Sequence, residues 1–181
     1  MNRYYNDCGC NGTISDIGTT CNINRSCNNG CSCLTPQQTP VCIDKAYGGI
    51  YNTTASTISL TNVSQTTVPL TTATPVLNVT TGLNTLTVTA SGVYEVDYFV
   101  SGSSTDDNTV TLSVLNNGMV IAGTSISQDV NAGVDTIISG KFIANLPAGS
   151  VISLGLLSSS ETSSFDLNTN TSAYLDIIKI G

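Results

Sequence analysis

The chain has 181 residues, which fits one domain of ordinary size with an appended segment. Only 9% of the residues are charged, against about 25% in a typical soluble domain, and Ser, Thr and Asn take the place of the missing charges. With a net charge of −7 and five Lys and Arg residues, the chain cannot form a phosphate-binding basic surface, so we expect no nucleic-acid partner. Histidine is absent, which excludes motifs built on that residue, and we expect no cofactor.

The N-terminal residues MNRYYNDCGC contain no apolar run of the length, about 7–15 residues, that a secretory signal needs. No stretch reaches the roughly 18 apolar residues that cross a bilayer, so we expect no membrane partner. Abundant cysteine nevertheless suits an oxidising, extracellular environment. A protein made without a signal peptide in the mother cell of a sporulating bacterium, and released by lysis, meets both conditions. A leader missing from the sequence is the weaker alternative.

All the cysteines lie near the N-terminus, which divides the chain into a Cys-rich arm, 1–45, and a Cys-free domain, 46–181. The arm has too few large apolar residues to fold by burial, so cross-links or docking must order it. Its CGCNG and CNNGCSC units hold cysteines at i and i+2, which are poorly placed to bridge each other. The seven residues predicted to form inter- or intra-subunit disulfides are Cys8, Cys10, Cys21, Cys27, Cys31, Cys33 and Cys42.

Seven is an odd number, so at least one cysteine is free or bonded to another chain. The favoured interpretation is a set of intermolecular disulfides that lock a polymer. An intramolecular disulfide knot with one spare thiol is the second interpretation. A thiolate metal cluster is the third, and it is weakened by the absence of Cys-x-x-Cys pairs. The stretch LTPQQTPVC, which follows the Cys33 position, contains Pro36 and Pro40 and is therefore expected to be extended. A stiff tether between subunits would have this property.

From residue 46 onward, short runs rich in Val, Ile, Thr, Tyr and Leu recur every 8–12 residues or so between Gly, Asn, Asp and Ser clusters. This pattern predicts an all-β sandwich or barrel. We expect turns at Asn116-Asn117-Gly118 and at Leu146-Pro147-Ala148-Gly149. The expected strands are 46–51, 57–60, 67–70, 76–79, 85–89, 92–101, 109–115, 119–127, 135–145, 150–157 and 172–180.

Some of these strands are apolar on one face and others on both. The runs 85–89 and 109–115 alternate apolar residues with Thr and Ser, so one side of each faces water. The runs 136–146, 151–157 and 175–178 are apolar on both faces. Such strands are covered by another layer or form an oligomer interface, and we favour the interface because no obvious covering element is present.

Four segments, AYGGIYNTTASTISL, SGVYEVDYFVSG, LPAGSVISL and SAYLDIIKIG, occur in this order. Together they resemble the C-terminal domain of BclA-type collagen-like exosporium glycoproteins over residues 46–181. The resemblance implies a tumour-necrosis-factor-like jelly roll of about ten strands, related to the complement-type globular head, that forms trimers at the spore surface.

The chain departs from that family pattern because no Gly-X-Y repeat precedes the domain. Properties of the collagen-like stalk, including its dense glycosylation, therefore do not carry over. A Cys-rich arm ahead of a jelly roll instead resembles, in architecture, the subunits of endospore appendage fibres, whose connectors join successive subunits covalently.

Glu95 and Asp97 fall on one face of the strand 92–101. They are a weak candidate for a hydrolase pair, because no His or nucleophile motif accompanies them, and a solvated strand face is the plainer interpretation. The resemblance places this strand beside those that carry Lys141 and Lys179, in the sheet facing the trimer axis. We therefore predict that Glu95 or Asp97 forms a trimer-interface ion pair, within or between subunits, with Lys141 or Lys179.

The acidic run Asp106-Asp107-Asn108, with Asp129 and Asp135, offers oxygen ligands for a cation such as calcium, but a turn is the favoured interpretation. We predict neither a metal site nor a catalytic residue. The sequence thus predicts a non-enzymatic, self-assembling subunit of the spore surface, in the exosporium or an appendage fibre, with other spore-surface proteins as further candidate partners. The alternative is a trimeric surface module that binds a carbohydrate or a host receptor.

Overall fold

The computed structural model describes residues 45–181, so the predictions made for the seven cysteines of the arm lie outside the described residues. The described part of the chain is built from strands, turns and loops, which confirms the predicted all-β class. Within it, no helix is long and apolar enough to cross a membrane. The compact unit begins at Lys45 and runs to Gly181.

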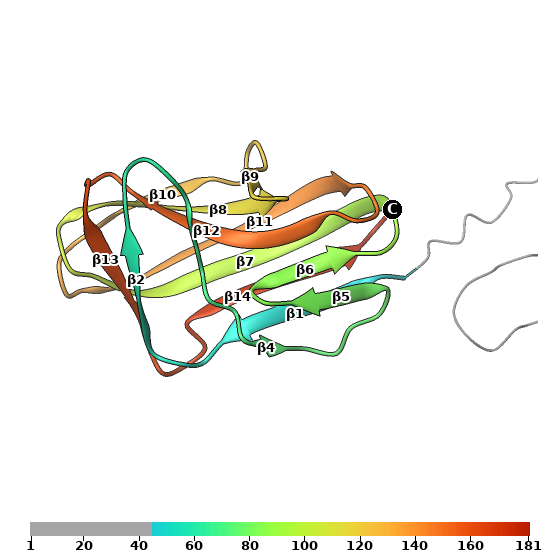
Figure 1. Ribbon diagram of the computed structural model, residues 1–181, viewed down its shortest axis with the longest axis horizontal. Coiled ribbons are helices and arrows are strands. Elements are labelled where there is room, and N and C mark those ends of the chain that lie inside the picture. The colour runs from blue at the N-terminus through green and yellow to red at the C-terminus, as the bar shows by residue number, and fades with distance from the viewer. Residues whose placement is uncertain (1–44) are drawn as a thin grey trace, which may run out of the picture. The chain divides into compact units, whose positions relative to one another are not determined.

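The strands form two antiparallel sheets that face each other across one core (Figure 1). The first sheet has the order β2 (Ser56–Leu60), β13 (Ser163–Leu167), β7 (Gly92–Ser104), β14 (Ala173–Lys179), β1 (Tyr47–Asn52) and β4 (Thr72–Ala73), and β11 (Asp135–Leu146) also pairs with β7. The second has the order β10 (Ile126–Val130), β8 (Asn108–Asn116), β12 (Val151–Ser158), β6 (Thr85–Val88) and β5 (Val79–Gly82), with β3 (Thr66–Thr67) on β12 and β9 (Met119–Val120) on β8.

Strand β7 is the centre of the first sheet. Strand β11 pairs with it from Gly92 to Ser103, and so occupies one whole edge of β7. Strands β14 and β13 therefore follow one another along the opposite edge. Gly102 makes the second of these junctions possible, since a Cβ there would lie 2.2 Å from the carbonyl oxygen of Asp166.

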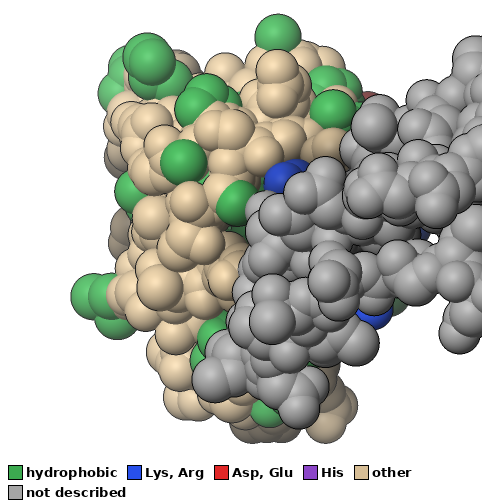
Figure 2. Space-filling view, turned by 90° about the vertical axis from the view of Figure 1, so that its right-hand side faces the viewer, with side chains coloured by type: hydrophobic (Ala, Val, Ile, Leu, Met, Phe, Trp, Pro, Cys, Tyr) green, Lys and Arg blue, Asp and Glu red, His purple; other side chains and the backbone are tan. Residues whose placement is uncertain are grey.

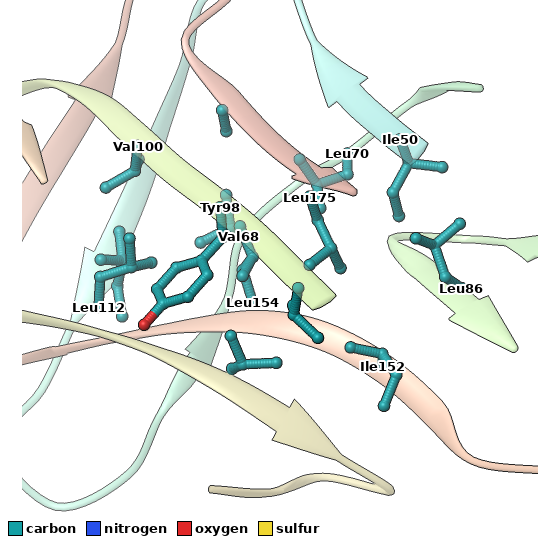
Figure 3. Packing of buried hydrophobic residues seen from close by; sticks show 14 of the residues in the cluster. Ile50, Val68, Leu70, Leu86, Tyr98, Val100, Leu112, Ile152, Leu154 and Leu175 are labelled. Atoms are coloured by element: carbon teal, nitrogen blue, oxygen red, sulfur yellow. The ribbon is translucent and has the colours of Figure 1, made fainter. Parts of the chain in front are cut away.

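Side chains from both sheets fill the core (Figure 3). From β7, the inward residues Tyr94, Val96, Tyr98 and Val100 are at most 2% exposed. In Figure 3 the ring of Tyr98 projects from β7 toward Leu112. The Tyr98 hydroxyl donates a hydrogen bond to the carbonyl oxygen of Thr124, so this buried phenol is satisfied by the chain just before β10.

Both expected turns are confirmed. Asn117 and Gly118 have φ values of 52° and 80°, the left-handed pair that closes a tight hairpin, here between β8 and β9. Gly149 has a φ of 86°, and the Ser150 amide donates to the carbonyl of Pro147 at 3.1 Å.

Several strand predictions were wrong in detail. Of the run 67–70 only Thr67 belongs to a strand, β3, and β4 was not predicted. The run 119–127 is split into β9 and β10, because Gly123 adopts a φ of 87° and the Thr124 hydroxyl bonds back to Ile121 at 2.8 Å. The run 76–79 contributes to β5 only at its last residue, since Asn78 has a φ of 52°. Strand β13 was not predicted, because its short SSFDL run offers only Phe165 and Leu167 as inward apolar positions.

The strands expected to be apolar on both faces have two different explanations. In β12, six of the eight residues are buried within the subunit, and the Gln65 side chain lies over Gly155. The interface interpretation is therefore wrong for most of β12, which its own chain covers. Strands β11 and β14 keep exposed isoleucines on the side away from the core.

Candidate interaction surface

The surface of interest is the side of the first sheet that faces away from the core, formed by β1, β14, β7 and β11. We call it the outer face. Alternation along β7 assigns residues to it as predicted: Tyr94 and Val96 point into the core, while Glu95 and Asp97 point outward and are half-buried. The register of the neighbouring strands then determines which side chains flank these two carboxylates.

A charged cluster occupies the middle of the outer face and comprises Glu95, Asp97, Lys141 and Asp176. Asp97 on β7 is opposite Lys141 on β11 and opposite Asp176 on β14. The Lys141 Nζ lies 3.0 Å from Glu95 Oε1 and 3.5 Å from Asp97 Oδ2. One lysine thus bridges two carboxylates inside a single subunit, and these are the ion pairs among residues 45–181.

Asp176 is the carboxylate of the cluster that Lys141 does not contact. Burial raises its pKa, and the charges of Asp97 and Glu95 add to that rise, while Tyr174 and the Ile177 amide oppose it. The pKa of Tyr174 is also raised, chiefly by burial and next by the charge of Asp176. The hydrogen bond and charge of Glu95 raise the pKa of Lys141 and favour its ammonium form. The cluster holds three carboxylates and one ammonium, so it carries excess negative charge at neutral pH.

Apolar side chains lie on both sides of this cluster. On one side, Tyr47, Ile178 and Ile143 line up across β1, β14 and β11 beside Glu95. On the other side, Tyr51, Tyr174 and Phe99 form a second row, in which the rings of Phe99 and Tyr174 are 5.7 Å apart. Six of the thirteen exposed large apolar side chains in the described chain belong to this one face: Tyr47, Val93, Ile137, Ile143, Ile178 and Ile180.

Such a concentration of exposed apolar residues on one sheet face is typical of a protein–protein contact. The outer face of the second sheet differs, because polar side chains such as Thr111 on β8 and Ser127 on β10 pair there through hydroxyls 2.9 Å apart. On the part of the domain that Figure 2 leaves uncovered, hydrophobic side chains are scattered among other side chains and backbone. The first sheet is therefore the stronger candidate for an interaction surface.

The structure brings Lys141, but not Lys179, to the predicted carboxylates. In β14, Lys179 is opposite the inward residue Tyr94, and its side chain closely contacts Gly92 at the end of the sandwich. Glu95, Asp97 and Lys141 do meet within the subunit, and their role at a trimer interface stays a prediction. Sequence reasoning missed Asp176, although the alternation of Tyr174, Asp176 and Ile178 in the last strand placed it on the same face.

The acidic residues considered for calcium hold turns and strands together. Asp107 accepts the Ala132 amide at 2.7 Å, Asp129 accepts the Thr109 hydroxyl at 2.7 Å, and Asp135 accepts the Asn168 amide at 3.2 Å. Among residues 45–181, no three Asp, Glu, His or Cys side chains gather as a metal site would require. These contacts agree with the turn interpretation of this acidic run.

Comparison with known proteins identifies the family to which the domain is similar. Residues 48–181 match the family model described as the BclA C-terminal domain. Among solved structures, Eiger TNF from S. frugiperda is similar with a TM-score of 0.52 and 14% identity, over 76% of this chain and 92% of that chain. Murine APRIL at pH 8.5 is similar with a TM-score of 0.53 and 10% identity, over 76% of this chain and 100% of that chain. No curated protein matches the chain. The structural likeness shows a TNF-like jelly roll, as predicted.

Proposed function

The chain belongs to the BclA C-terminal domain family, and from that premise we propose that it is a structural subunit of the spore surface that self-assembles through trimers. The family suggests an exosporium-type structural domain, and TNF-like and BclA-type domains are typically homotrimeric, which is consistent with self-association. The observation that carries the proposal is the outer face, where apolar rows flank a charged cluster. The partner on this face is a second copy of the chain.

Two properties of the outer face favour a copy of the same chain as the partner. Burial of its exposed isoleucines and tyrosines against a partner stabilises the complex, by about 25 cal/mol for each Å² of apolar surface removed from water. Its charged cluster holds both signs of charge, so the Lys141 ammonium of one copy has carboxylates to meet on another. A ring of three copies closes such a contact when each copy uses the same pair of surfaces.

We further propose that the arm makes this assembly covalent. All seven cysteines lie within residues 1–45, next to the domain that provides the non-covalent contact. Association of the domains raises the local concentration of the arms. Two thiols on neighbouring subunits then form a disulfide and give two electrons and two protons to an extracellular oxidant such as dioxygen. The first step determines which subunits meet, and the second step makes the contact permanent.

The trimer is tested by measuring the mass of the full chain in reductant, by sedimentation equilibrium. The wild type is expected at three times the monomer mass, and Ile143→Glu is expected to dissociate, because it adds a charge to an apolar row of the outer face. Leu83→Glu is the matched control, since Leu83 is 84% exposed and lies between β5 and β6 in the second sheet. A wild type that is monomeric at all concentrations, or equal effects of the two variants, would contradict the proposal.

The covalent step is tested separately, by electrophoresis and electron microscopy with and without reductant. A polymer locked by disulfides gives a ladder of bands and long fibres that disappear when thiol is added. Discrete trimers without a ladder contradict the polymer and fit the alternative of a trimeric binding module.

A further inference from the structure

We propose that the charged cluster makes self-association acid-strengthened, so that subunits bind one another more tightly in mild acid than at neutral or alkaline pH. The inference rests on the proposed function, because it requires two copies to meet through the outer face. It concerns the control of that contact and not its existence.

We attribute the pH dependence to Asp176, because its nearest charged neighbours are carboxylates. From β7, Asp97 and Glu95 face it, and both already share Lys141, which comes from β11. The titratable side chains that flank it on its strand and on β1 are phenols: Tyr174 beside it, and Tyr47 and Tyr51 across the sheet. Lys179 is on the same strand, but it is opposite the inward residue Tyr94 and lies against Gly92. No cation of the described residues forms an ion pair with Asp176.

The β1 side of Asp176 is uncharged and closely packed. A Cβ at Gly49 would lie 3.1 Å from Asp176 Oδ1 and 3.1 Å from Thr74 Oγ1, so the backbone of β1 covers the carboxylate closely. The carboxylate is therefore already partly removed from water in a single subunit. A second copy laid on the outer face removes it further.

The direction of the pH effect follows from linkage. Burial raises the pKa of Asp176 in the free subunit, and deeper burial against a second copy raises the pKa again. A group whose pKa rises on association takes up a proton when the copies meet, so association strengthens as pH falls from neutrality through the raised pKa.

Counting the charges of the cluster gives the same direction for the pH effect on association and also its approximate size. At neutral pH the cluster of each copy has three carboxylates and one ammonium, and protonation of Asp176 removes one of the two excess charges. A like-charge repulsion at about 10 Å in a partly buried site weakens association roughly tenfold. We therefore expect the subunit dissociation constant to be smaller in mild acid, at about pH 5.5, than at about pH 8, with roughly tenfold as the limit when Asp176 is fully protonated in the assembly.

The experiment is sedimentation equilibrium of the full chain in reductant at both pH values. Asp176→Asn keeps the shape of the side chain and removes its charge, so this variant should associate at the higher pH as the wild type does in acid. Asp129→Asn is the matched control, because it removes one carboxylate from β10 in the second sheet. It should keep the pH dependence of the wild type.

The outcomes separate this inference from the proposed function. A wild type that associates equally at both pH values overturns the inference and leaves the trimer intact. The same result for the two variants also overturns it, because the pH dependence would then reflect total charge and not the cluster. A chain that stays monomeric at both pH values overturns the proposed function, and the inference with it.

Discussion

Replacing Tyr98 by Phe removes a single hydroxyl that ties the two sheets together. Tyr98 is 2% exposed on β7, and its hydroxyl donates to the carbonyl of Thr124, which lies between β9 and β10. Thr124 is itself fully buried, and its hydroxyl accepts the Val114 amide at 3.1 Å. The substitution leaves the Thr124 carbonyl without this donor in a dry site, which costs about 1–3 kcal/mol.

Tyr94→Phe is the matched control for this loss. Its hydroxyl donates to the Ala90 carbonyl at 2.7 Å, in a partly buried position where water can replace the phenol. Denaturant unfolding in reductant, at one protein concentration, should give a cost of about 0.5–1 kcal/mol for Tyr94→Phe and at least about twice that for Tyr98→Phe. Equal costs for the two variants would refute the claim that the Tyr98 hydroxyl is a dry tie between the sheets.

Three further substitutions test the remaining contacts. Gly102→Ala should destabilise the domain by about 2–3 kcal/mol in denaturant unfolding, because its Cβ would meet the carbonyl oxygen of Asp166 at 2.2 Å, and an unchanged midpoint would contradict this close contact. Lys141→Gln should leave the midpoint of denaturant unfolding nearly unchanged, since the ion pairs are exposed, while altering the mass distribution in sedimentation. Asp176→Asn should stabilise the subunit at neutral pH: a folded-state pKa raised above 3.8 means that ionisation opposes folding, so the wild type gains stability as pH falls, and the variant does not.

Strand faces and tight turns were predictable because they depend on neighbouring residues. The pleat sends alternate residues to opposite sides, so the apolar character of Tyr94, Val96 and Tyr98 was enough to place Glu95 and Asp97 on the outer face. Likewise, the hairpin after β8 needs two residues with positive φ, which its Asn-Gly pair adopts at low cost.

Features that depend on distant parts of the chain were not predictable in this way. The cover that Gln65 gives to Gly155 joins residues ninety positions apart, so the sequence of β12 alone could not distinguish a covered strand from an interface. Strand β13 exists because β2 and the end of β7 accept it, although its five residues carry a weak pattern. Lys141 and Lys179 were equivalent candidates until the register placed Lys179 opposite an inward residue.

We propose for the charged cluster a role in assembly that its small ionic energy does not suggest. The chain holds 17 charged residues in all, from five basic and twelve acidic side chains, and the cluster places four of them together between two apolar rows. A sheet face that was apolar throughout would associate in several registers with similar free energy, because burial of apolar surface has little directional preference. A charge that is buried between two copies without an opposite charge beside it is strongly unfavourable. The cluster would therefore disfavour every register of association except those that bring Lys141 to carboxylates. If copies meet through the outer face, as we propose, the cluster determines their register and the apolar rows determine how strongly they associate. A fixed register would in turn give every Cys-rich arm the same neighbours, which orderly disulfide cross-linking requires.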